Sequence, residues 1–224
     1  MNDVVRPVSL SPMFPLGGPL MPGALLPLQV FEPRYLELID RCLVSRSAEF
    51  GVVMIERGSE VGGGDVRKNV GTAARIVEVK TITEGRLAVL AVGQRRIEVV
   101  RWLEDDPFPR AEVRDWPDED LVDGGIVSSS PVADLRVTAM RGLDRVRGLV
   151  SELGVKVPER PDLDDLDPVE ASYAVATLAP LGSADRQRLL CAGGVRRRFE
   201  LFSEVLSEVE DSLRFRLLNS RSDD

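Results

Sequence analysis

Histidine is absent from this 224-residue chain, and cysteine is scarce. Without histidine the protein has no Ser-His or Cys-His nucleophile pair and no His-ligated metal. Cys42 and Cys191 lie far apart in the sequence, and two cysteines make neither a four-thiolate zinc site nor the disulfide framework of a small secreted protein. We therefore expect two buried or half-buried thiols, no metal site and no cofactor.

Lysine is also rare, and Lys68, Lys80 and Lys156 are its only occurrences. A Ser-Lys dyad needs a desolvated lysine whose pKa is lowered. We expect Lys68 in a mobile loop over residues 57–69, Lys156 in a connector, and the amine of Lys80 in solvent. The glycine run within that loop is followed by aspartate and lacks the Lys-Ser/Thr pair of a phosphate-binding loop. The sequence thus predicts a protein that is not an enzyme.

Long apolar runs and a surplus of basic residues are missing as well. No stretch approaches the ~20 apolar residues that span a bilayer. Asp3 and Pro7 interrupt the N-terminus, so we expect no signal peptide, no membrane partner and a cytoplasmic location. The net charge is −8 and is spread evenly over both halves, which disfavours a nucleic-acid binder. The arginines at 196–198 precede Glu200 at helical spacing, which predicts a solvated face with ion pairs.

The chain is 43% hydrophobic and 29% charged, as is typical of a soluble globular protein. Short apolar runs with alternating character and few helical patterns predict a barrel-like sheet in the first half. The expected strands cover residues 9–14, 25–30, 51–56, 72–82, 87–92, 96–103 and 110–116. Gly85 can supply the positive φ of a hairpin turn between two of them.

From about Pro117 the pattern becomes helical. Residues 118–123 are acidic, and the stretch from Ser128 to Pro131 has the composition of a linker. Asp167, Pro168 and Glu170 supply an N-cap, a proline at the first helical position and a capping-box carboxylate. Four helices are expected. The first runs from Val132 to Leu153, and the second begins at Pro168. The third is capped by Ser183 and ends at about Cys191, and the fourth runs from Val195 to Leu213. Each has one apolar stripe, which predicts a helical bundle and an α+β fold class overall.

The ten residues ending at Tyr35 read LPLQVFEPRY and predict a strand that turns into a helix. Pro33 suits the first position of a helix, because it lacks a backbone N–H. We expect Phe31, Pro33 and Tyr35 to hold this corner rigid, with Phe31 buried, and Glu32 and Arg34 to form an ion pair.

The same run resembles the LPL-x-[IV]-FEPRY corner of the N-terminal domain of Lon proteases, which also occurs in free-standing substrate-binding-domain proteins. Further segments match in order: MFPL from Met13, FGVV from Phe50, VGTAARI from Val70, GRL from Gly85, VGQRRI from Val92 and AEV from Ala111. The C-terminal half matches more loosely, through RQRLL from Arg186 and RFELF from Arg198. Gln29 departs from the pattern, since many relatives have histidine there.

The resemblance implies a PUA-like mixed β-barrel over residues 8–118 and a C-terminal helical bundle over residues 131–218. It also implies a free-standing, non-catalytic module, without ATPase and peptidase domains, that binds unfolded or exposed apolar polypeptide segments. Two alternatives stay open. An RNA-binding protein would need Arg75, Arg86, Arg95 and Arg96 clustered on one face. A structural subunit would instead dock a partner protein through the helical bundle, and a homo-oligomer is also open.

We place the polypeptide-binding site on the loop at 20–25 and the hairpin tip at 83–86. Loop positions favour exposure, and exposed apolar side chains mark contact surfaces. The expected site residues are Leu20, Met21, Leu25, Thr83, Glu84 and Arg86. The alternative is that Leu20 and Met21 fold back and plug one end of the barrel.

Overall fold

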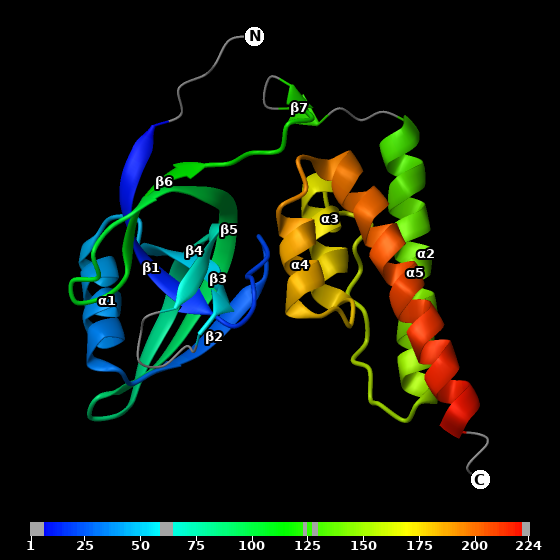
Figure 1. Ribbon diagram of the computed structural model, residues 1–224, viewed down its shortest axis with the longest axis horizontal. Helices are drawn as coiled ribbons and strands as arrows, with labels where there is room; N and C mark the ends of the chain where they lie inside the picture. Colours follow the sequence, from blue (N-terminus) through cyan, green and yellow to red (C-terminus); the bar gives the residue numbers. More distant parts are fainter. Residues whose placement is uncertain (1–6, 59–64, 123–124, 127–129, 221–224) are drawn as a thin grey trace. The chain divides into compact units, whose positions relative to one another are not determined.

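A sheet and a set of helices occupy separate parts of the chain in the computed structural model (Figure 1). The structure describes residues 7–58, 65–122, 125–126 and 130–220. The chain divides into two compact units, Met1–Pro117 and Asp118–Asp224. The expected α+β class is confirmed, with a six-stranded sheet and five helices in the described residues.

The sheet of the first unit closes on itself. Its strands are β1 (Val8–Leu16), β2 (Leu25–Val30), β3 (Glu49–Arg57), β4 (Val66–Thr83), β5 (Arg86–Trp102) and β6 (Arg110–Asp115). Their order is β2-β5-β4-β3-β1-β6, and β5 also pairs with β6. Five strands therefore form a ring, and β2 lies beside it at an edge. The β1–β3 pair is parallel and the other pairs are antiparallel.

The single strand β5 covers nearly all the residues predicted to form two strands, at 87–92 and 96–103. Ala73 pairs with Arg95 and Ala74 with Gly93, so Gln94 is an extra residue that the ladder absorbs as a bulge rather than a chain reversal. The predicted loop at 57–69 is wrong at both ends, because Arg57 belongs to β3 and Val66 already begins β4. Residues 59–64, which include the glycine run, lie outside the described residues.

The ring has an apolar interior to which all five of its strands contribute. The buried residues of this cluster are Met13, Val53, Ala73, Ile97, Val99, Ala111 and Val113. The small side chains of Ala73 and Ala111 lie among the larger ones, which suits the interior of a narrow closed sheet. Gly51 leaves room here, since a Cβ at that position would lie 2.5 Å from Met13 Sδ.

A second apolar cluster lies between the sheet and helix α1 (Pro33–Val44). Spacings of three and four residues put Tyr35, Leu38, Ile39 and Cys42 on one buried face of that helix. The Tyr35 ring stacks on Phe14, with centroids 4.1 Å apart. These contacts fix the helix against β1 and so fix the corner from which it begins.

The second unit contains helices α2 (Ser130–Glu152), α3 (Pro168–Leu178), α4 (Ser183–Leu190) and α5 (Val195–Ser220), and a ribbon of β7 (Leu121–Val122) and β8 (Gly125–Ile126). The two long helices, α2 and α5, pack together, and α3 contacts both. The capping box of α3 is confirmed: Glu170 N donates to Asp167, 2.9 Å, and the Glu170 carboxylate accepts from Asp167 N, 3.3 Å. Gly182, not Ser183, occupies the N-cap of α4. No helix within the described ranges is long and apolar enough to cross a membrane.

The basic run of α5 has two faces. Arg196 and Arg197 pair with Glu200 on the solvated side, as predicted. Arg198 does not, because a helix turns each successive side chain by about 100° and brings the third arginine to the buried side. Arg198 is fully buried, and its guanidinium donates to both carboxylate oxygens of Asp118.

The acidic stretch that begins at Asp118 is bound to α5. Besides the Asp118 pair, the Asp120 carboxylate accepts hydrogen bonds of 3.0 Å from the backbone N–H groups of Val195 and Arg196. These two N–H groups lie in the first turn of α5, where backbone donors have no carbonyl partner within the helix. The Asp120 carboxylate therefore caps the N-terminus of α5. Gly194 permits the approach, since a Cβ there would lie 2.4 Å from Asp120 Oδ1.

Candidate functional site

The edge strand β2 presents two different faces. Leu26, Leu28 and Val30 pack on the cluster beneath helix α1. Leu25 and Gln29 alternate with them and are exposed. Leu25 is 65% exposed. No described strand pairs with the outer edge of β2. The strand thus carries an apolar outer face beside an open edge.

Further exposed apolar side chains continue this outer face across the sheet. On β4, Ile76 and Val79 pack inward, so the strand turns Val77 and Ile82 outward, where both are about half exposed. Phe31 follows β2 directly and is 51% exposed. We call Leu25, Phe31, Val77 and Ile82 the outer apolar face. Leu25 and Val77 lie toward one end of β2, and Phe31 and Ile82 toward the other.

The hairpin tip lies beside Phe31. Gly85 has φ +72° and turns the chain so that Thr83 pairs with Arg86. Val30 pairs with Leu87, which brings the tip to the end of β2. The Arg86 guanidinium carbon is 5.8 Å from the centre of the Phe31 ring. Thr83, Glu84 and Arg86 are all exposed here.

The corner between β2 and α1 is built as predicted in all but one residue. Arg34 Nη2 lies 3.0 Å from Glu32 Oε2, which confirms the ion pair, and Pro33 occupies the first turn of the helix. Tyr35 is 4% exposed, and its burial raises the pKa of the phenol to about 12. The burial expected for Phe31 is wrong. Because Val30 points inward, the next residue of the extended chain points outward.

Leu20 and Met21 do not join the outer apolar face. They are 6% and 2% exposed, so their expected exposure is wrong. Leu20 belongs to the cluster beneath helix α1. The carbonyl of Leu20 accepts a 2.6 Å hydrogen bond from Thr72 Oγ1. The carbonyl of Met21 closely approaches Gly93, where a Cβ would lie 2.4 Å away. The loop is therefore held down on β4 and β5, which leaves Leu25 as its exposed apolar end.

The arginine cluster that RNA binding would require is not formed. Arg96 is buried and lies over the Trp116 ring, 4.5 Å from its centre. Arg95 is committed to Glu49 and Asp115, at 2.9 and 2.8 Å.

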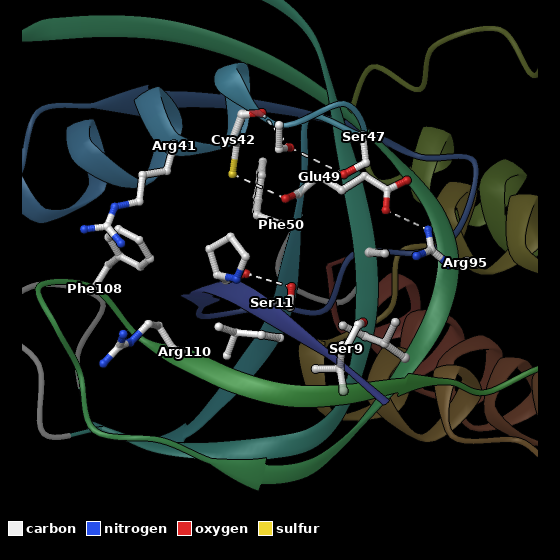
Figure 2. Close-up of a pocket in the computed structure, with 16 residues that line it drawn as sticks. Ser9, Ser11, Arg41, Cys42, Ser47, Glu49, Phe50, Arg95, Phe108 and Arg110 are labelled. Carbon is white, nitrogen blue, oxygen red and sulfur yellow. Dashed lines mark hydrogen bonds and ion pairs between the residues drawn. The ribbon is translucent and has the colours of Figure 1, made fainter. Parts of the chain in front are cut away.

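A cavity of about 480 Å³ opens on another side of the first unit, and no sequence pattern pointed to it (Figure 2). Its walls are the first half of β1, the end of α1, the start of β3 and the segment that enters β6. Arg41 and Arg110 lie on one side with Phe108 between them, and the Glu49–Arg95 ion pair lies on the other. The lining residues come from segments spread between Ser9 and Val113, so only the fold brings them together.

The thiol of Cys42 lines this cavity and donates a 3.3 Å hydrogen bond to the Glu49 carbonyl. Burial raises the pKa of Cys42 to about 12, so the thiol stays neutral at ordinary pH. Cys191, expected to be at least half-buried, is exposed. We expect iodoacetamide to alkylate Cys191 in the native protein and Cys42 only after unfolding, as read by peptide mass spectrometry. Equal labelling of both cysteines in the native state would contradict this.

The raised pKa of Cys42 also makes the free energy of unfolding depend on pH. The unfolded chain loses the thiol proton near the ordinary value of 9.0, before the native protein does. The contribution of Cys42 to the free energy of unfolding is therefore complete below pH 9.0. It is lost as the pH rises toward about 12.

The architecture defines the class of protein. The sheet and helices match the crystal structure of a Lon N-terminal domain protein from Xanthomonas campestris, with a TM-score of 0.62, 29% identity and coverage of 86% of this chain and 95% of that one. The N-terminal domain of the Mycobacterium avium complex Lon protease has the same fold, with a TM-score of 0.58 at 16% identity, and the match covers 89% of this chain and 98% of that domain.

The family model for the substrate-binding domain of ATP-dependent protease La (Lon) matches residues 11–208, so the chain belongs to this family. Among curated proteins, Lon protease 1 of Herpetosiphon aurantiacus is 25% identical over 202 residues, which cover 86% of this chain. Lon protease 2 of the same organism is 28% identical and covers 87%. The matched region is 23% of each protease, so this chain spans about a quarter of the length of these relatives.

Proposed function

We propose that this protein is a non-catalytic polypeptide-binding module that engages unfolded or exposed apolar segments. We further propose that its closed sheet is a PUA-like barrel over residues 8–118, followed by a helical bundle over residues 131–218. The outer apolar face at the open edge of β2 is the single observation that carries the function. Membership of the Lon substrate-binding family supports the same assignment.

The outer apolar face has the chemistry of a docking surface. Each of its four side chains is about half exposed or more, although burying one fully would stabilise the protein by about 1.5–3 kcal/mol. The bound polypeptide can supply that burial. Pro27 lies in the middle of β2 and, like prolines on other edge strands, limits pairing with further strands. Binding through side chains, with little backbone pairing, tolerates varied client sequences.

The proposed contact residues are Leu25, Phe31, Thr83, Glu84 and Arg86, with Val77 and Ile82 beside them. Glu84 and Arg86 lie at the hairpin tip beside Phe31, where their charges can favour some bound polypeptides over others while the apolar side chains keep their contacts. Leu20 and Met21 take a supporting role in this proposal, because they anchor the loop that carries Leu25.

Changing Leu25 and Phe31 together to serine is expected to weaken binding of chemically unfolded casein by about tenfold or more, since two apolar contacts are lost. The melting temperature should stay within a few degrees of the wild-type value, because both side chains are largely exposed already. Fluorescence anisotropy of labelled casein measures the first quantity and circular dichroism the second. The casein should remain intact throughout.

The matched control changes Leu20 and Met21 to serine, which removes buried side chains and should lower the melting temperature markedly. Unaltered casein affinity in the folded Leu25/Phe31 variant would rule out the outer apolar face as the binding surface.

A further inference from the structure

The strand β1 changes its neighbour halfway along. Residues from Val8 to Pro12 pair with β6, and residues from Met13 to Leu16 pair with β3. No described strand pairs with the first half of β1 on the side where β3 later begins. The cavity in Figure 2 occupies this place and is lined by the first half of β1, including Leu10 and Pro12.

Backbone polar groups face the cavity from β1. Successive residues of a strand direct their N–H and C=O groups to opposite edges. Met13 N donates to the Pro109 carbonyl next to β6 at 2.8 Å, so Leu10, three residues earlier, directs its N–H and C=O away from β6. Pro12 also faces away and has no N–H to leave unsatisfied. Leu10 thus offers one donor and one acceptor to an extended chain.

The wall at the Pro12 end is cationic. Arg110 pairs across the ladder with Pro12, and Arg41 reaches the same side from α1, with its guanidinium 5.2 Å from the Phe108 ring. The partners of both arginines are exposed. Asp106 lies 3.6 Å from Arg110, which also donates a 3.2 Å hydrogen bond to the Glu104 carbonyl, and Glu37 forms an exposed ion pair with Arg41. Arg110 Nε has no hydrogen-bond partner. The single carboxylate in the lining, on Glu49, is already held by Arg95.

We propose that this cavity binds the carboxyl terminus of an extended polypeptide. Arg41 and Arg110 bind the terminal carboxylate at the wall that also carries Phe108, and the preceding residues add as a strand to the free edge of β1 at Leu10. Because the cationic wall is at the Pro12 end, the bound chain runs parallel to β1, in line with β3. A volume of about 480 Å³ suits a chain end, since ligand sites typically occupy about 300–1,000 Å³. The proposal rests on the proposed polypeptide-binding function and adds a second recognised feature of the client.

The test uses a short fluorescent peptide of alternating valine and threonine, with either a free carboxylate or an amide at its C-terminus. The wild-type protein is expected to bind the carboxylate form about tenfold more tightly, since two charge-assisted hydrogen-bonding partners act on it. Changing Arg41 and Arg110 together to glutamine should remove this difference. The matched control changes Arg101 and Arg114, two exposed strand arginines, to glutamine and should preserve it.

A peptide N-methylated near its C-terminus tests the strand pairing without altering the protein, and should bind several-fold more weakly than its parent. Equal affinity of the wild-type protein for the carboxylate and amide peptides would overturn the proposal, even if the arginine variant fails to fold. Unfolded casein is measured in parallel. If casein binds but the peptides are not discriminated, only the carboxylate site is wrong. If casein does not bind, the proposed function itself fails.

Discussion

Replacing Arg198 with methionine is expected to lower the free energy of unfolding by about 3–5 kcal/mol, because it leaves the Asp118 carboxylate buried without its counter-charge. The guanidinium also donates to Ser172 Oγ at 2.7 Å and lies 3.8 Å from the Tyr173 ring centre, so the change removes several contacts at once. Urea denaturation followed by circular dichroism measures the loss.

Arg197, the preceding residue of the same helix, provides the control. Its partners are exposed, and Arg197→Met should leave the free energy of unfolding close to the wild-type value. A double variant, Arg198→Met with Asp118→Leu, should recover much of the loss, because it removes both buried charges. A single Arg198→Met variant as stable as the wild type would show that the ion pair does not stabilise the attachment of the Asp118 segment to α5.

Replacing Tyr35 with alanine is expected to lower the free energy of unfolding by about 3–5 kcal/mol, as for other buried aromatic residues. The ring fills the space between α1 and the sheet and stacks on Phe14, so its removal leaves a cavity in the cluster. Phe31→Ala, four residues earlier in the chain, should cost no more than about 1 kcal/mol, since the ring is half exposed.

The two variants are compared by the same urea titration, with unfolded-casein binding measured beside it. Tyr35→Ala should lose stability, and Phe31→Ala should chiefly lose affinity for casein. Similar stability losses for both would mean that Phe31 is packed as tightly as Tyr35, contrary to the exposure seen here.

The secondary structure was largely predictable because it follows local patterns. The alternation in residues 25–30 and the spacing in the helix that follows specify β2 and α1 directly. The exposure of Phe31 was not predictable from residue type, since aromatic residues are often buried. Only the register of β2 directs this side chain outward. Leu20 and Met21 show the converse. Their glycine- and proline-rich surroundings indicated an exposed loop, but the contacts that bury them come from Thr72 and Gly93.

The buried ion pair and the cavity were beyond sequence analysis for a common reason. Asp118 and Arg198 are far apart in the chain, and each lies in a charged run that is typical of solvated surface. The cavity likewise joins Arg41 and Arg110 through tertiary packing. The periodicity of apolar residues indicates which face of a helix or strand is buried. It does not indicate which polar group from a distant part of the chain will contact that face.

The pairing of β1 with β6 bears on how the sheet forms during synthesis. Val8, in the first strand of this sheet in chain order, pairs with Arg114 in the last strand of the sheet. The ring can close only after nearly the whole first unit has been translated, and such distant pairing makes folding slow. Until then β1 and β5 have open edges that other chains can pair with. A nascent chain stalled before residue 110 would therefore be especially prone to aggregate.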